Sequence, residues 1–202
     1  MARAQAKTIG PVDVHVPTGA ATLARGLMGV VGFAVLTALA AQVRVGVPVP
    51  MTLQTLGVLL AGYFLSPRLA AISMVLYVFV GAFLLWPVFA LHGGLSGMTG
   101  GYLMAFAPAA WLVSRLRGTG DASWMRLSLA GLGGTTLVFA GGVAWMANLM
   151  GGWGAAASAG LFPFLPGAVV KLALALAVVQ CGRRLRPGSI AGSSDREAGG
   201  SD

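Results

Sequence analysis

Hydrophobic residues form six long runs in this chain, and short segments containing Gly, Pro and Arg separate the runs. A helix of about 20 apolar residues crosses the hydrocarbon core of a bilayer, and shorter helices suffice inside a bundle. The two-residue alternation of a membrane barrel is absent. The pattern therefore predicts an all-α, polytopic membrane protein, a bundle of six transmembrane helices. The expected spans are 23–43, 51–65, 69–86, 100–116, 127–150 and 167–181.

Composition supports the membrane assignment. Of the 202 residues, 57% are hydrophobic and 9% are charged. Soluble domains contain about 25% charged residues, so we exclude a soluble fold. The net charge of +8 could indicate nucleic-acid binding, but the basic residues flank apolar runs and form no patch with aromatic residues. We therefore expect no nucleic-acid partner and assign the charge to membrane topology. Cys181 is the one cysteine, which excludes an intramolecular disulfide.

The chain divides into three segments. Residues 1–22 contain no continuous apolar core, so we interpret them as a cytoplasmic N-terminal segment and not as a signal peptide. Residues 23–182 form the six-helix transmembrane domain. Residues 183–202 begin with basic residues and continue as a Gly-, Ser- and Asp-rich cytoplasmic tail, for which we predict disorder.

The positions of the basic residues predict the orientation. Most of them fall in four regions that lie on one side of a six-span bundle: Arg3, Lys7, Arg25, Arg68, Arg115, Arg117, Arg126, Arg183, Arg184 and Arg186. The connections on the opposite side hold only Arg44 and His92. Because positive charge favours the cytoplasmic side, both termini are predicted to be cytoplasmic.

Lys171 is the strongest candidate for a functional residue. It lies within an apolar run, and no Asp or Glu occurs in any hydrophobic segment. A Lys near the centre of a membrane helix costs about 2.5–3.5 kcal/mol, so it normally has a partner or a function. Together with the start of the last span, it predicts a site for an anionic ligand. The alternative is a Lys that extends to the outer headgroups.

Other candidates fall at the same depth. Arg44 lies at the outer end of the first span and Gln54 in the first turns of the second, so both could face one vestibule. Arg suits carboxylate recognition, although Arg44 could instead contact headgroups, and Gln offers a donor and an acceptor to an amide or urea. Three aromatic residues could form a ligand wall or an interfacial belt: Tyr102, Trp86 and Phe89. Tyr77 lies in mid-span and is interpreted as packing.

No pattern indicates catalysis. His92 stands alone, and neither a metal-ligand cluster nor a nucleophile with an acid–base neighbour occurs in the sequence. We therefore expect no enzyme, no metal and no cofactor. A GxxxxGK[ST] phosphate loop is also missing, so an ATP-driven role would need another subunit. Ala34 and Ala38 form a small-xxx-small step that lets another helix approach closely.

Several segments together resemble the BioY family. The most specific is residues 47–58, Val-Pro-Val-Pro-Met-Thr-Leu-Gln-Thr-Leu-Gly-Val. The resemblance covers residues 25–182, and the other segments that carry it are residues 67–68, 77–81, 87–90, 99–103 and 163–167, with Lys171 four positions on. BioY proteins are the biotin-specific substrate-binding (S) components of energy-coupling-factor (ECF) transporters. The resemblance implies the same six-helix topology in a bacterial cell (inner) membrane.

The resemblance also implies roles for particular residues. Lys171 and Gln54 would be the principal biotin-binding residues, and a glycine-rich loop would close the pocket, with Gly93, Gly94, Gly97 and Thr99 as its members. Ala34 and Ala38 would dock on the transmembrane coupling protein, which acts with two ATPase subunits. The family has an Asp after the glycine at position 167, whereas this chain has Ala168. The site is therefore more cationic than the family pattern.

Two other functions remain open on the sequence. The chain could be an autonomous secondary carrier for a small carboxylate or a related vitamin, using the same cationic pocket without ATP. A membrane scaffold that binds no small molecule is the third hypothesis.

Overall fold

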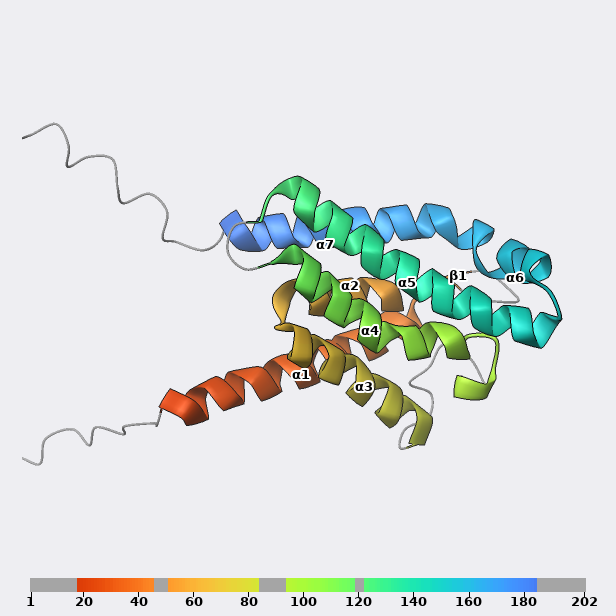
Figure 1. Cartoon of the computed structure of the whole chain (residues 1–202). Helices are drawn as coiled ribbons and strands as arrows, with labels where there is room; N and C mark the ends of the chain where they lie inside the picture. The colour runs from red at the N-terminus through yellow and green to blue at the C-terminus, as the bar shows by residue number, and fades with distance from the viewer. Residues whose placement is uncertain (1–17, 46–50, 84–93, 119–121, 185–202) are drawn as a thin grey trace, which may run out of the picture.

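The computed structural model describes residues 18–45, 51–83, 94–118 and 122–184. Six of its helices occupy the six predicted apolar runs, which confirms the all-α membrane bundle (Figure 1). These helices are α1 (Thr18–Gln42), α2 (Gln54–Phe64), α3 (Pro67–Phe83), α4 (Gly100–Arg117), α5 (Trp124–Met150) and α7 (Leu165–Arg184).

Two features differ from the sequence prediction. A short helix α6 (Trp153–Gly160) and a 3-10 turn η2 (Phe162–Phe164) join α5 to α7. The eight residues of α6 are too few to cross a bilayer, so a search for spans does not detect it. The second span was predicted to begin at Met51, but Met51–Thr52 form strand β2, and α2 begins at Gln54. This strand pairs antiparallel with β1 (Arg44–Val45), with Arg44 opposite Thr52.

The outer surface of the bundle fits a lipid environment. Among the described residues, three helical stretches are long and apolar enough to cross a membrane: Gly19–Gln42, Trp124–Met150 and Trp153–Arg184. Helices α2 and α3 are apolar but shorter. One face of α1 exposes large apolar side chains at a spacing of four residues, namely Leu23, Leu27, Val31, Val35 and Leu39. Such a continuous apolar face would be unfavourable in water and is suited to contact with acyl chains.

Helices α4 and α5 lie side by side over most of their length (Figure 1). Glycine allows this close approach. A Cβ atom at Gly141 would lie 2.8 Å from Ala105 Cβ and 3.1 Å from the carbonyl oxygen of Gly101. Because the second contact is with backbone, a larger residue here would push the two helices apart. The tight pair forms one rigid wall of the interior.

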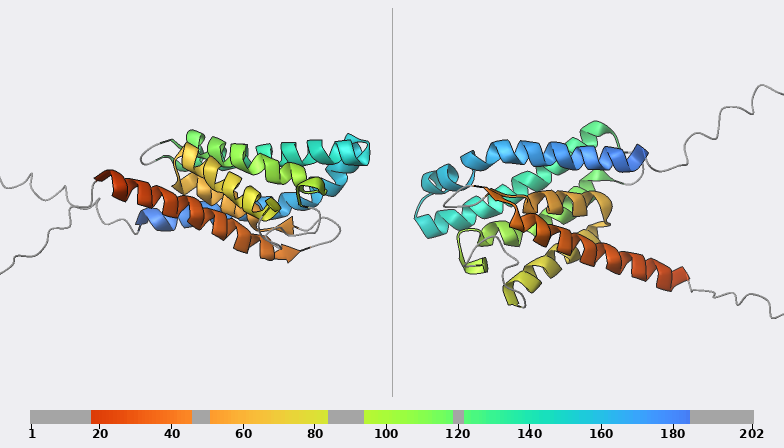
Figure 2. Two further views of the ribbon diagram at one scale, coloured as in Figure 1. Left: turned by 90° about the horizontal axis from the view of Figure 1, so that it is seen from below. Right: turned by 180° about the vertical axis from the view of Figure 1, so that it is seen from behind.

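Helices α1 and α3 meet at a crossing. The hydroxyl of Ser73 on α3 donates a hydrogen bond to the carbonyl oxygen of Val30 on α1, at 2.8 Å. Beyond this point the two helices point apart (Figures 1 and 2). An apolar groove of about 230 Å³, here called the α1–α3 groove, opens on one side. It is lined by Val31, Ala34, Val35, Ala38, Leu39, Leu76, Tyr77 and Val80.

Three arginines hold the connections at one end of the bundle. The guanidinium of Arg117 donates to the carbonyl oxygens of Gly62 and Leu65, both at 3.1 Å, and so caps the C-terminal end of α2. Arg126 donates to Leu116 O at 2.8 Å, and Arg183 donates to Ala122 O at 2.9 Å. Carbonyls at a helix C-terminus lack intrahelical partners, so Arg117 and Arg126 stabilise the ends of α2 and α4 as well as adding positive charge.

Candidate binding pocket

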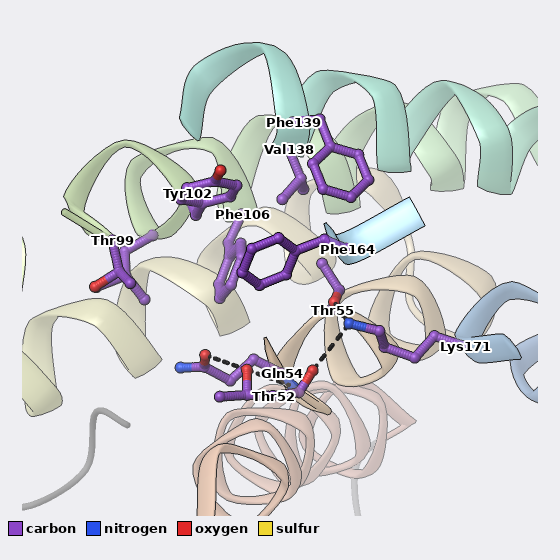
Figure 3. A pocket seen from close by; sticks show the side chains of 11 residues that line it. Thr52, Gln54, Thr55, Thr99, Tyr102, Phe106, Val138, Phe139, Phe164 and Lys171 are labelled. Carbon is purple, nitrogen blue, oxygen red and sulfur yellow. Dashed lines mark hydrogen bonds between the residues drawn. The ribbon is translucent and has the colours of Figure 1, made fainter. Parts of the chain in front are cut away.

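Lys171 projects from α7 into the interior of the bundle. Its side chain is 6% exposed, and its Nζ donates to the carbonyl oxygen of Thr52 at 2.9 Å and to Thr55 Oγ1 at 3.0 Å (Figure 3). Thr52 ends β2, and Thr55 lies in the first turn of α2. The ammonium group therefore lies inside the protein and not along its lipid-facing surface. None of the described residues is an Asp or a Glu, and the two acceptors of this ammonium group, Thr52 O and Thr55 Oγ1, are neutral.

Helix α7 begins at Leu165, two residues earlier than the expected start of the sixth span. Lys171 is consequently in the second turn, and its ammonium faces the N-terminal turn of α2. The sequence had associated this residue with the free amides at the start of its own helix. The structure instead gives it one partner from β2 and one from α2, which only the tertiary packing of α2 against α7 could reveal.

A small cavity opens beside Lys171. Its volume is about 60 Å³, whereas binding pockets for small molecules usually enclose about 300–1,000 Å³. Side chains of the protein therefore occupy most of the space that a ligand would need. Residues from β2, α2, α4, α5, η2 and α7 line it: Thr52, Gln54, Thr55, Thr99, Tyr102, Leu103, Phe106, Val138, Phe139, Phe164 and Lys171.

The polar end of the cavity is organised around Gln54, which is 8% exposed. Its Oε1 accepts a hydrogen bond from the Thr52 hydroxyl at 2.6 Å, and its Nε2 donates to the hydroxyl of Tyr77 on α3. Sequence analysis interpreted Tyr77 as packing. The position of its hydroxyl in the middle of an apolar helix could have indicated a polar contact, since a buried Tyr usually has a hydrogen-bond partner.

Aromatic side chains form the opposite end. The Tyr102 hydroxyl donates to Gly160 O at 2.6 Å, and its ring lies 6.4 Å from that of Phe164 and 6.5 Å from that of Phe139. Phe164, carried by η2, lies between Phe106 and Phe139 in the middle of the site (Figure 3). Phe106, Phe139 and Phe164 were not predicted. In the sequence of a membrane helix, an apolar residue that lines a pocket cannot be distinguished from one that faces lipid.

The structure brings four predicted site residues to this cavity: Lys171, Gln54, Tyr102 and Thr99. Arg44 lies in β1, but its side chain falls outside the described part. Trp86, Phe89 and Gly93 also lie outside the described residues. Gly94 begins the 3-10 turn η1 (Gly94–Ser96), and the carbonyl oxygen of Gly97 accepts from Trp145 Nε1 at 3.0 Å.

The two predicted docking residues line the α1–α3 groove. Ala34 is 7% exposed and packs within the core, and Ala38 is half-buried. The small side chains therefore let α1 approach α3 and leave room in the groove beside them.

The arrangement favours binding over catalysis. A lysine with neutral partners can attract an anionic group, and Gln54 keeps one N–H and one oxygen lone pair beyond the hydrogen bonds described above. Within the described residues no group of three or more His, Cys, Asp or Glu side chains could hold a metal.

Known proteins resemble the chain along most of its length. A model of the BioY family matches residues 11–188. A probable biotin transporter BioY from Pyrococcus horikoshii is 37% identical over 153 residues, which cover 73% of this chain and 90% of that protein. The biotin transporter BioY of Rhodobacter capsulatus is 32% identical over 166 residues, covering 73% of this chain and 86% of that one.

A solved structure has the same fold. It is the S-component for biotin from an ECF-type ABC transporter, with a TM-score of 0.71 at 22% sequence identity. The match covers 82% of this chain and 94% of that one.

Proposed function

The chain belongs to the BioY family, and on this premise we propose that it is a membrane-embedded subunit that binds biotin for uptake. The observation that carries the proposal is the buried Lys171, a cation with neutral partners, beside the cavity that Gln54 also lines. Biotin has the complementary groups: a carboxylate at one end, a cyclic urea at the other and an apolar ring and chain between them.

Each part of biotin has a partner in this proposal. The carboxylate binds Lys171, with Arg44 assisting electrostatically, and the urea binds Gln54. Because Thr52 contacts both Lys171 and Gln54, this mode requires the flexible acid chain of biotin to fold back toward the ring. The ring lies against Tyr102 and the other aromatic residues of the site. Trp86 and Phe89 complete the wall. Transfer of apolar ligand surface from water to these side chains favours binding.

Ligand entry requires a movement, because the cavity of about 60 Å³ is smaller than the vitamin. Two elements reach it: the η2 turn through Phe164, and the glycine-rich loop of Gly93, Gly94, Gly97 and Thr99 through Thr99. We propose the second as the lid, because glycines permit large changes of backbone conformation.

Energy would come from partner subunits. The sequence contains no phosphate loop for ATP, and the S-component fold suggests an ECF module with a transmembrane coupling protein and ATPases. A helix of the coupling protein would dock beside Ala34 and Ala38 in the α1–α3 groove. An autonomous carrier is the alternative. Depleting ATP while preserving the ion gradients should stop uptake by the ECF-dependent subunit and leave a secondary carrier active.

Replacing Lys171 tests the binding site. Breaking a buried ion pair costs about 3–5 kcal/mol, so Lys171→Met should weaken biotin binding by roughly two to three orders of magnitude. The amide of biotin has no negative charge, so it should bind wild type more weakly than biotin does and lose little more in the variant. Calorimetry on purified protein measures both ligands.

Thr55→Val is the matched control. It removes one partner of the ammonium group but keeps the charge, so it should cost less than about tenfold in affinity. If Lys171→Met binds biotin as tightly as wild type, the carboxylate lies elsewhere and this binding mode is wrong. If purified wild type binds no biotin, the proposed function is wrong.

A further inference from the structure

Tyr77 lies on α3 and is not one of the residues that line the cavity. It is 1% exposed, and its hydroxyl accepts a hydrogen bond from Gln54 Nε2. Its ring also stacks on Phe106, a cavity residue, with centroids 6.3 Å apart and an interplanar angle of 22°. Tyr77 therefore contacts two residues of the site from outside it.

The amide of Gln54 is held at both ends. Thr52 Oγ1 accepts the backbone N–H of Gln54 at 3.4 Å and donates its own hydrogen to Oε1 at 2.6 Å. Tyr77 holds the other end through Nε2. A free glutamine side chain loses considerable rotamer entropy when a ligand fixes it. Here the protein has already fixed the amide plane before a ligand arrives, which lowers the cost of binding.

The fixed Gln54 amide keeps part of its hydrogen-bonding capacity for a ligand. A primary amide offers two N–H donors and two lone pairs on oxygen, and Thr52 and Tyr77 each use one. The remaining N–H and the remaining lone pair lie on one plane and can pair with a group that has both an acceptor and a donor. A cyclic urea has both on adjacent atoms.

We infer that Tyr77 is a positioning residue for ligand specificity. It holds the Gln54 amide in the orientation that reads a urea-type N–H and C=O, without touching the ligand itself. The inference rests on the proposed biotin-binding function and adds the residue that makes Gln54 selective. It predicts that loss of the Tyr77 hydroxyl affects discrimination between ligands more than it affects the fold.

The test compares two ligands on three proteins. Biotin and an analogue whose ring lacks the urea N–H groups are titrated into wild type, Tyr77→Phe and Tyr63→Phe. Tyr63 is the matched control: it is also buried, and its hydroxyl donates to Leu127 O at 2.7 Å, away from the cavity. Tyr77→Phe should lower the preference for biotin over the analogue by about 3- to 10-fold, the range that one neutral hydrogen bond supplies. Tyr63→Phe should leave this preference unchanged.

A Gln54→Ala background separates positioning from packing. If Tyr77 acts through Gln54, adding Tyr77→Phe to Gln54→Ala should not change the preference further. An effect of the same size in both backgrounds would overturn the inference. So would a Tyr77→Phe protein that discriminates as wild type does.

Three outcomes separate the inference from the proposed function. If Tyr77→Phe does not fold, Thr52→Val replaces it as the test, because it releases the other end of the same amide. This variant should also lower the preference for biotin over the analogue. An unchanged preference would reject the inference. If wild type binds biotin but Tyr77→Phe behaves like Tyr63→Phe, the inference fails and the biotin-binding function stands. Absence of biotin binding to wild type would instead remove the function itself.

Discussion

At the scale of single residues, Lys171 shows how a charge is accommodated in an apolar helix. The carbonyl oxygen of Thr52 and the hydroxyl of Thr55 supply two charge-assisted hydrogen bonds, each worth about 1.5–3 kcal/mol. These bonds offset the cost of about 2.5–3.5 kcal/mol for a Lys near the middle of a membrane span. They leave its net charge uncompensated. A ligand carboxylate would supply the missing negative charge.

Position 168 tests how the ligand ring is placed. We expect Ala168→Asp to give the site an acceptor for a urea N–H, and to tighten binding of biotin relative to the analogue without these groups by about 1–3 kcal/mol. Desolvation of the new carboxylate opposes the gain, and Lys171, one turn away, offsets part of it. Calorimetry with both ligands measures the change, and Ala168→Asn separates the contribution of charge from that of the acceptor atom.

Ala168 is half-buried and does not line the cavity as it stands. An Ala168→Asp protein that prefers biotin over the analogue to the same degree as wild type would show that the ring lies away from α7. In that case Gln54 alone would read the urea.

The sequence could predict polar residues that line the cavity and not the apolar ones. Lys171, Gln54 and Tyr102 stand out because polar or aromatic residues are rare among aliphatic neighbours at those depths. Phe139 and Phe164 do not stand out, since a membrane helix carries apolar residues on every face, whether they meet lipid, core or ligand. Only the packing of α5 and η2 onto α4 identifies them as residues of the site.

At the scale of helices, the close contact between α4 and α5 depends on glycines, which have no side chain. We predict that Gly141→Ala destabilises the protein by about 1–3 kcal/mol, because the added Cβ meets Ala105 Cβ and the backbone of Gly101. Thermal unfolding in detergent, with and without biotin, measures this change.

Gly133→Ala on the same helix is the control. A Cβ there would meet only the ends of two leucine side chains, Leu116 at 3.3 Å and Leu112 at 3.8 Å. These can rotate, so we expect a change smaller than about 0.5 kcal/mol. Equal losses for both variants would contradict the view that backbone contact limits this interface.

Helix prediction succeeded where length and composition suffice. Six apolar runs gave six helices because a bilayer demands long segments whose backbone is hydrogen-bonded internally. Helix α6 and strands β1 and β2 were missed because they are short and derive their stability from neighbouring elements. The β1–β2 pair matters for the site, since it positions the Thr52 carbonyl that Lys171 contacts.

At the scale of the whole molecule, the distribution of arginines predicts that both termini and the α4–α5 connection are cytoplasmic, with η1 outside. Single cysteines at Ser96 and Met125, introduced after Cys181→Ala, should therefore react with an impermeant reagent from opposite sides. Ser96 lies in η1, and Met125 is exposed in the first turn of α5.

Labelling of both positions from the same side would exclude this topology. The same experiment tests the access route, because η1 precedes Thr99 at the cavity. If Ser96→Cys reacts from outside and biotin slows the reaction, the glycine-rich loop closes over the bound vitamin.

Tyr77 has one further consequence for the molecule. Its hydroxyl holds Gln54 at the cavity, and its ring is also a wall of the α1–α3 groove. A partner helix that enters the groove and shifts this ring would change the affinity for the ligand. Thermodynamic reciprocity then requires the bound ligand to change the affinity for the partner by the same factor. Attachment of the energising subunits and release of the vitamin would thus be thermodynamically coupled. The position of the Tyr77 ring would set the size of this coupling.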